Sequence, residues 1–169
     1  MNIELSLAQC VGLLSFALGI ITFCQVDTRR FKVMMLVFNL NHLTHFLLMG
    51  APVAAFGSLI SVLRTGASIY FSSFYVASFF LAINLAIGSW LATSWFDLFA
   101  IAGSMIGTYA IFMLTGTRMR LAFLAGSICW LINNFIIGSI GGVMLETVVI
   151  CVNLMNIYRM KRTPTNLAT

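Results

Sequence analysis

Hydrophobic residues lie in long, nearly continuous runs along the chain, and short polar or glycine-containing stretches separate these runs. There are seven runs, at residues 5–26, 31–49, 53–70, 74–92, 95–114, 121–137 and 142–158. A helix that spans a bilayer needs about 20 apolar residues, whereas the strands of a membrane barrel alternate between apolar and polar positions. Because backbone in lipid must satisfy its own hydrogen bonds, the pattern predicts an all-α, polytopic membrane protein with seven transmembrane helices.

The composition excludes the other common classes of protein. Hydrophobic residues make up 61% of the 169 residues and charged residues only 8%, whereas an ordinary soluble domain carries about 25% charged residues. The low charge and an aromatic content of 13% also exclude a disordered chain. The four cysteines are scattered through the apolar runs and do not indicate a disulfide scaffold.

The positions of the basic residues predict the orientation in the membrane. Lys and Arg at the ends of membrane helices favour the cytoplasmic side, so the net charge of +5 does not indicate a nucleic-acid partner. In a seven-span topology, Glu4 and Asp97 fall outside, and every basic residue falls on the opposite side or in its inner leaflet. The basic residues are Arg29, Arg30, Lys32, Arg64, Arg118, Arg120, Arg159, Lys161 and Arg162. We therefore predict an N-terminus outside, a cytoplasmic C-terminus and a first helix that is retained rather than cleaved.

The chain also matches itself at an offset of 88 residues without a gap. The matched pairs include Gly19 with Gly107, Arg30 with Arg118, and Gly50 with Gly138. Helix ends, basic loops and turn glycines coincide, which predicts two parallel three-helix repeats joined by a fourth linker helix, a 3+1+3 arrangement. The predicted units are residues 1–73 and 93–158 for the repeats, 74–92 for the linker helix, and 159–169 for a cytoplasmic polar tail.

Several polar side chains interrupt the apolar runs, and they supply the candidate binding residues. Polar groups are costly in lipid and are expected to face the bundle interior or a cavity. We predict a substrate-binding site made of His42, His45, Trp130, Asn133, Glu146 and Asn153. In this site Trp130 would stack on a planar solute, the two Asn side chains would hydrogen-bond it, and His42 or His45 would carry a coupling proton. The alternative is that the Asn and His side chains only join helices by hydrogen bonds.

Two other residues in the apolar runs have less definite predicted roles. Glu146 is the only acid well inside a run. Arg64 lies toward the inner end of the third run, too far from Glu146 in depth for an ion pair, and its long side chain could reach the cytoplasmic headgroups.

Signals for catalysis, metals and cofactors are weak. The sequence contains no His-Glu-x-x-His, Gly-x-Ser-x-Gly or Gly-x-x-x-x-Gly-Lys motif. His42 and His45 lack a nearby acid or thiol that would complete a metal site. We therefore expect no enzyme activity, no metal and no cofactor.

Several segments resemble a known family of bacterial inner-membrane proteins, the YgjV family. They are 7–12, 27–32, 45–50, 64–65, 134–135 and 138–142, and the last of these, Gly-Ser-Ile-Gly-Gly followed by Glu146, is the most specific. The resemblance covers nearly the whole chain and implies a location in the bacterial inner membrane and a topology, but no substrate.

The predicted architecture also resembles, more loosely, the SWEET sugar carriers, the PQ-loop proteins and the PnuC vitamin-precursor carriers. The SWEET resemblance implies a pocket with paired Trp on helices two and six and paired Asn on helices three and seven. Trp130 and Asn153 fit this pattern, whereas His42 and Thr65 depart from it, and the chain has no Pro-Gln pair. Sugar specificity therefore does not follow from the resemblance.

The sequence as a whole favours a carrier or facilitator that moves a small solute by alternating access. The expected partners are the lipid bilayer and a small-molecule solute, and the sequence leaves a homo-oligomer open. The alternative is a non-transporting membrane protein for interaction, assembly or sensing, and a membrane enzyme acting on lipid is a third, weaker option. A polar cavity lined by the predicted site residues would favour the carrier.

Overall fold

The computed structural model describes residues 6–23, 28–71, 73–114 and 116–162, and the regular secondary structure within these ranges is all helical. The side chains of Arg29, Arg159, Lys161 and Arg162, together with Glu4 and the predicted tail beyond Arg162, lie outside the described part. The helices are α1 (Leu7–Phe23), α2 (Thr28–Leu48), α3 (Pro52–Tyr70), α4 (Phe74–Leu91), α5 (Asp97–Met113), α6 (Gly116–Ile136) and α7 (Ile140–Arg162). The predicted all-α fold is confirmed, with each helix in one of the seven apolar runs.

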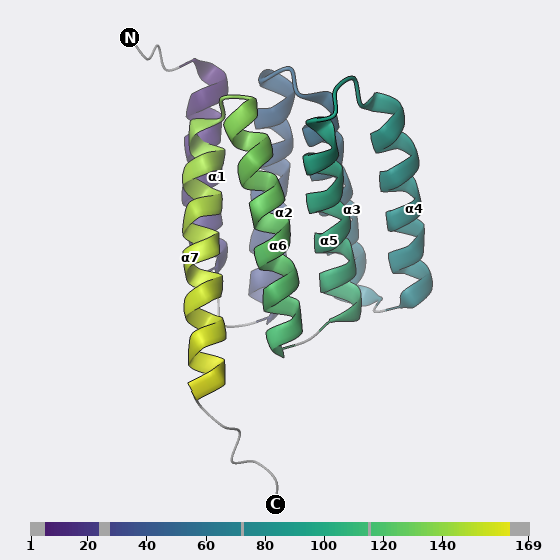
Figure 1. The fold of residues 1–169 in the computed structure, drawn as a ribbon, viewed down its shortest axis with the longest axis vertical. Helices are drawn as coiled ribbons and strands as arrows, with labels where there is room; N and C mark the ends of the chain where they lie inside the picture. The colour runs from purple at the N-terminus through teal and green to yellow at the C-terminus, as the bar shows by residue number, and fades with distance from the viewer. Residues whose placement is uncertain (1–5, 24–27, 72, 115, 163–169) are drawn as a thin grey trace, which may run out of the picture.

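The helices lie side by side along the long axis of the molecule, in two layers (Figure 1). One layer contains α1, α2 and α3, and the other contains α5, α6 and α7. The layers meet where α1 packs on α7 and where α3 packs on α5, while α4 packs at one edge against α3 and α5. The start of α1 and the end of α7 lie at opposite ends of the bundle.

Two turns at the same end of the bundle have matching geometry. Gly50 between α2 and α3 has φ +66°, and Gly138 between α6 and α7 has φ +73°. The residue after each glycine donates its backbone N–H to the carbonyl five residues earlier, Ala51 to Phe46 at 3.0 Å and Ser139 to Asn134 at 2.9 Å. This is the Schellman pattern of helix ends, in which glycine accepts the left-handed conformation without steric cost.

The outer surface is apolar and much of the polar content is inside. Large exposed hydrophobic side chains occur along the helices, with Phe79 and Phe135 as examples, and Trp90 is 82% exposed. By contrast, Asn84 and Asn134 are among the most deeply buried side chains. An apolar exterior over a partly polar interior is typical of a bundle surrounded by lipid.

Length and hydropathy identify three candidate membrane spans among the described residues, namely α3, α4 and Thr117–Ile136 of α6. The apolar parts of three other helices are shorter, at Leu7–Thr22, Asp97–Met113 and Ile140–Met155. The remaining helix, α2, carries His42, His45 and Asn39, which are buried in the bundle and lower its mean hydropathy. The prediction of seven spans therefore stays a prediction.

Candidate solute-binding site

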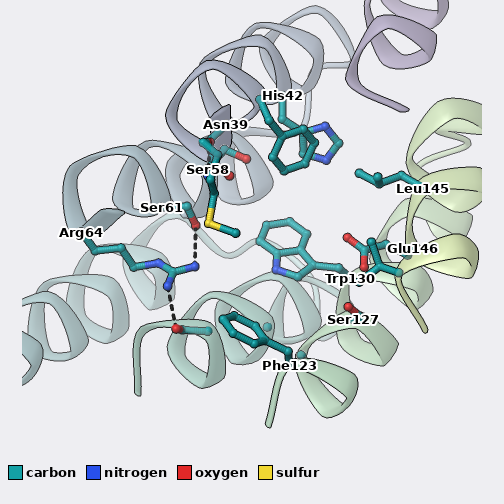
Figure 2. Close-up of a pocket in the computed structure, with 16 residues that line it drawn as sticks. Asn39, His42, Ser58, Ser61, Arg64, Phe123, Ser127, Trp130, Leu145 and Glu146 are labelled. Atoms are coloured by element: carbon teal, nitrogen blue, oxygen red, sulfur yellow. Dashed lines mark hydrogen bonds between the residues drawn. The ribbon is translucent and has the colours of Figure 1, made fainter. Parts of the chain in front are cut away.

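A cavity of about 90 Å³ lies between the two layers of helices. Residues of α2, α3, α5, α6 and α7 line it, and Figure 2 shows how side chains converge on it from different helices. The polar and aromatic lining residues are Asn39, His42, Ser58, Ser61, Arg64, Ser127, Trp130 and Glu146, together with Phe38 and Phe123. A buried cavity with a few convergent polar groups is the usual form of a small-molecule site.

Helical periodicity explains why these side chains meet. Ser58, Ser61 and Arg64 follow one another at intervals of three along α3, so they project from one face of the helix. Asn39 and His42 on α2 share a face in the same way, as do Ser127 and Trp130 on α6. Helices α2, α3 and α6 therefore each turn a polar face toward the space between the layers.

Glycines on α5 make room for the two largest polar side chains of the site. A Cβ atom at Gly103 would lie 2.8 Å from the Trp130 ring, and one at Gly107 would lie 2.8 Å from Nη2 of Arg64. Both distances are shorter than real Cβ contacts. The indole and the guanidinium can therefore lie against α5 only because these positions lack side chains.

Arg64 is buried in the wall of this cavity and does not extend to the end of the bundle that was predicted to be cytoplasmic. Its side chain is 6% exposed. Nη1 donates to the Gly107 carbonyl oxygen at 2.6 Å, and Nη2 donates to Oγ of Ser61 at 3.3 Å. Nε has no hydrogen-bond partner. The guanidinium thus turns into the bundle because Gly107 leaves space for it and offers an acceptor.

Glu146 is the acidic residue of the cavity lining, and it lies on the other side of Trp130 from Arg64 (Figure 2). It is 8% exposed, and its carboxyl group lies beside the Ser127 side chain. No ion pair joins Arg64 and Glu146 within the part of the chain that the structure describes. The cavity therefore has one cationic and one acidic group on different walls.

Aromatic rings form the end of the cavity near His42. The His42 ring packs against Phe46 with centroids 4.4 Å apart, and Phe46 stacks on Trp130 at 5.7 Å with an interplanar angle of 14°. Nδ1 of His42 is buried and has no hydrogen-bond partner. A buried polar atom without a partner costs free energy, so this atom can bind a polar group that enters the cavity.

His45 lies outside the lining of this cavity. Its Nδ1 lies 2.7 Å from the Ala8 carbonyl oxygen, and its Nε2 lies 2.6 Å from Oγ of Ser139. Since a carbonyl only accepts, Nδ1 carries the proton and Nε2 accepts from the Ser139 hydroxyl. The neutral ring thus satisfies both bonds and joins α1, α2 and the turn before α7.

The remaining two predicted site residues, Asn133 and Asn153, are also buried away from the cavity lining. Nδ2 of Asn133 and both amide atoms of Asn153 have no hydrogen-bond partner. Of the six predicted residues, the structure thus brings three together around the cavity, namely His42, Trp130 and Glu146.

The 138–142 segment that resembles the YgjV family forms a packing junction. Oγ of Ser139 accepts from the Gly142 backbone N–H at 3.1 Å, so Ser139 caps the start of α7. Gly141 packs directly against the backbone of Gly12 on α1. These residues therefore hold α7 against α1, and they do not line the cavity.

Five polar residues of the lining were not among the predicted site residues, namely Asn39, Ser58, Ser61, Arg64 and Ser127. A signal was present for Arg64, because a charge inside an apolar run is a functional candidate. The spacing of three between Ser58, Ser61 and Arg64 could have added the two serines to the predicted site, because this spacing places all three side chains on one face of a helix. No group of three or more His, Cys, Asp or Glu side chains that could hold a metal occurs among the described residues.

A helical bundle with an apolar exterior and an internal cavity that polar side chains partly line defines a helical membrane protein. The sequence model of the Imp-YgjV family, described as bacterial inner membrane protein, matches residues 6–164. The chain is 34% identical over 156 residues to the inner membrane protein YgjV of Escherichia coli (strain K12), a match that covers 92% of this chain and 85% of the relative. The chain therefore belongs to the Imp-YgjV family of bacterial inner membrane proteins, as the resemblance predicted. No solved structure matches it significantly.

Proposed function

We propose that the protein is a carrier or facilitator that moves a small polar solute across the inner membrane by alternating access. The observation that carries this proposal is the cavity itself, in which buried Arg64, Glu146 and His42 face a common space. Charged side chains inside membrane proteins are expensive and mark solute or ion pathways.

The proposed architecture is seven membrane spans arranged as two three-helix repeats with α4 between them. A shift of 88 residues converts the α1–α7 contact into the α5–α3 contact, and the α1–α2 and α2–α3 contacts into α5–α6 and α6–α7. The same shift relates the hydrogen bonds of the Gly50 and Gly138 turns. Repeats of this kind support rocking of one half against the other around a central site.

The proposed orientation has α1 beginning outside the cell and α7 ending in the cytoplasm. Arg30 and Lys32 in the first turns of α2 and Arg118 and Arg120 in the first turns of α6 lie at one end of the bundle. This distribution is the one expected when that end faces the cytoplasm.

The proposed solute contacts are made by His42, Trp130, Glu146 and Arg64. Asn133 and Asn153 remain proposed site residues, because their unpartnered buried amides are costly in this conformation. A second conformation of a rocking bundle could bring these amides to the solute pathway. We assign His45 a positioning role instead, since its two nitrogen atoms are occupied by Ala8 and Ser139.

A non-transporting interaction or sensor protein is the second candidate. Some buried polar groups do join helices, since Nδ2 of Asn41 donates to the Val11 carbonyl and to Ser15, and Nδ2 of Asn84 donates to the Ile101 carbonyl. Such bonds favour a stable bundle. The bonds of Asn41 and Asn84 lie outside the cavity lining, however, and they do not account for the buried Glu146 or for the unpartnered Nδ1 of His42.

Uptake by proteoliposomes across a panel of small polar solutes tests the proposed function. The variant Trp130→Ala removes the central ring of the cavity, and we expect it to lower uptake about tenfold, equivalent to about 1.4 kcal/mol. Trp90→Ala is the matched control, because Trp90 is exposed on α4. Uptake of no solute by the wild type, or equal uptake by both variants, would contradict the proposal.

A further inference from the structure

Arg64 and Glu146, the basic and the acidic side chain of the cavity, lie on different walls, and neither has a partner of opposite charge among the described residues. The guanidinium of Arg64 bonds to neutral groups, the Gly107 carbonyl and the Ser61 hydroxyl, and its Nε is unpartnered. The Glu146 carboxyl group lies beside the neutral Ser127 hydroxyl. Both side chains are more than nine-tenths buried, and a buried charge without an opposite partner is costly.

The remaining walls of the cavity are neutral. Arg64 and Glu146 are the only Lys, Arg, Asp or Glu among the described residues that line it, so the lining has one basic and one acidic side chain. A solute with one anionic and one cationic group would complement both Arg64 and Glu146. A solute with a single charge would leave one of these two side chains without an opposite partner.

The depths of the two side chains suggest how far apart the charges of the solute lie. Measured from the first residue of each helix, Arg64 lies six residues deeper along α3 than Glu146 lies along α7. At a rise of 1.5 Å per residue, this corresponds to about 9 Å of backbone height, part of which the long Arg side chain can bridge. Charges at the two ends of a short chain fit this arrangement better than two charges on one carbon atom.

Size and the central aromatic ring restrict the solute further. A cavity of about 90 Å³ is larger than the share of one water, about 30 Å³, and far smaller than pockets for drug-sized ligands, about 300 Å³ or more. The Trp130 ring lies between the two charges (Figure 2). It offers an apolar face to a short hydrocarbon segment and attracts a cationic group.

We propose that the cavity binds a small zwitterion, with its anionic group at Arg64, its cationic group at Glu146 and its hydrocarbon segment against Trp130. The inference rests on the proposed carrier function, for which it names the solute class. Electrostatic complementarity is the basis of the selectivity for a zwitterion, because a solute with a single charge leaves either Arg64 or Glu146 buried without an opposite partner.

Binding to the purified protein in lipid nanodiscs tests this inference with three probes of matched length. The probes are 4-aminobutyrate, which carries both charges, butyrate, which carries only the negative one, and butylamine, which carries only the positive one. We expect 4-aminobutyrate to bind at least about tenfold more tightly than either probe with a single charge, in isothermal titration calorimetry.

Glu146→Gln replaces the carboxyl group of the cavity by a neutral amide of similar shape. We expect this variant to bind butyrate at least as tightly as 4-aminobutyrate. Thr147→Ala is the control, because Thr147 is the next residue on α7 and is exposed. Arg64→Gln should shift the preference to butylamine, with exposed Arg118→Gln as its control. If Arg64→Gln fails to fold, Arg64→Lys keeps the charge and should keep the preference for 4-aminobutyrate.

The outcomes separate the inference from the proposed function. Binding of butyrate or butylamine by the wild type as tightly as 4-aminobutyrate, an unchanged order in Glu146→Gln, or binding of none of the three probes would overturn the zwitterion inference. Uptake of other solutes by proteoliposomes would then still support a carrier. Selective binding of 4-aminobutyrate without uptake would contradict the proposed carrier function, while it would support a zwitterion as the ligand.

Discussion

At the scale of single residues, the two histidines of α2 have different environments although they are only one helical turn apart. The ring of His42 packs among aromatic side chains at the cavity, and its Nδ1 is unpartnered. The ring of His45 bonds to Ala8 and Ser139 and packs tightly against Gly12. One histidine is therefore available to a solute, and the other holds three segments of the bundle together.

Replacing His45 should lower stability. His45→Ala removes the hydrogen bonds of the ring to the Ala8 carbonyl and the Ser139 hydroxyl and opens a void, so we expect a loss of about 2–4 kcal/mol. Thermal unfolding of the purified protein measures this loss as a lower melting temperature. His42→Ala is the control, and should weaken solute binding with a smaller effect on melting. Equal melting of His45→Ala and the wild type would contradict the assigned role.

The site residues show what the sequence could and could not predict. A spacing of three places His42 and His45 on one face of a helix, but their roles depend on which neighbouring helices pack there. The direction of Arg64 was equally undetermined, because the glycine that makes room for it lies on another helix, α5. The stacking of Trp130 against Gly57 and Gly103 likewise depends on packing between helices.

At the scale of helices, α5 shapes the cavity through its glycines. Gly107→Ala should displace the Arg64 guanidinium, and we expect solute binding to weaken about tenfold or more. Gly66→Ala on α3 is the control, because the nearest atom to its added Cβ, in Leu36, is 3.9 Å away. That substitution should preserve binding and stabilise the helix by about 0.5–1 kcal/mol. Binding measured by calorimetry that is the same in both variants would contradict this role of α5.

The turns after α2 and α6 allow a test of the proposed repeat. Gly50 and Gly138 both have positive φ, and an added Cβ at either would meet nothing within 4 Å. The cost of alanine at each is then purely conformational, about 1–2 kcal/mol, and we expect similar decreases in melting temperature. Asn tolerates this conformation better, so Gly50→Asn and Gly138→Asn should recover part of the loss. Clearly unequal costs for the two alanine variants would count against equivalent turns.

The helices themselves could be predicted well from the sequence, because each follows from one long apolar run and its turn residues. The boundaries at Gly50, Pro52 and Gly138 coincide with strong local signals, which do not depend on packing. By contrast, no local signal could show that α4 packs at the edge of the bundle. The position of α4 depends on its contacts with α3 and α5, and the residues that make those contacts lie outside the α4 segment of the sequence.

At the scale of the whole molecule, the distribution of charge predicts the orientation of the bundle. In a variant without its native cysteines, Ser94→Cys and Gly138→Cys should react with a membrane-impermeant thiol reagent added outside intact cells. Arg118→Cys should react only after the cells are opened. All three positions are exposed, so accessibility in the bundle does not limit the reaction. Labelling of Arg118→Cys in intact cells would reverse the proposed orientation.

The central claim is that the cavity between the layers opens to both sides of the membrane in turn. A single cysteine at Ser127, which lines the cavity beside Glu146, tests this claim before the solute is known. We predict that impermeant thiol reagents label Ser127→Cys from either side of oriented vesicles, while Leu40→Cys on the exposed apolar surface stays unlabelled. Labelling of Ser127→Cys from only one side, or from neither, would contradict alternating access.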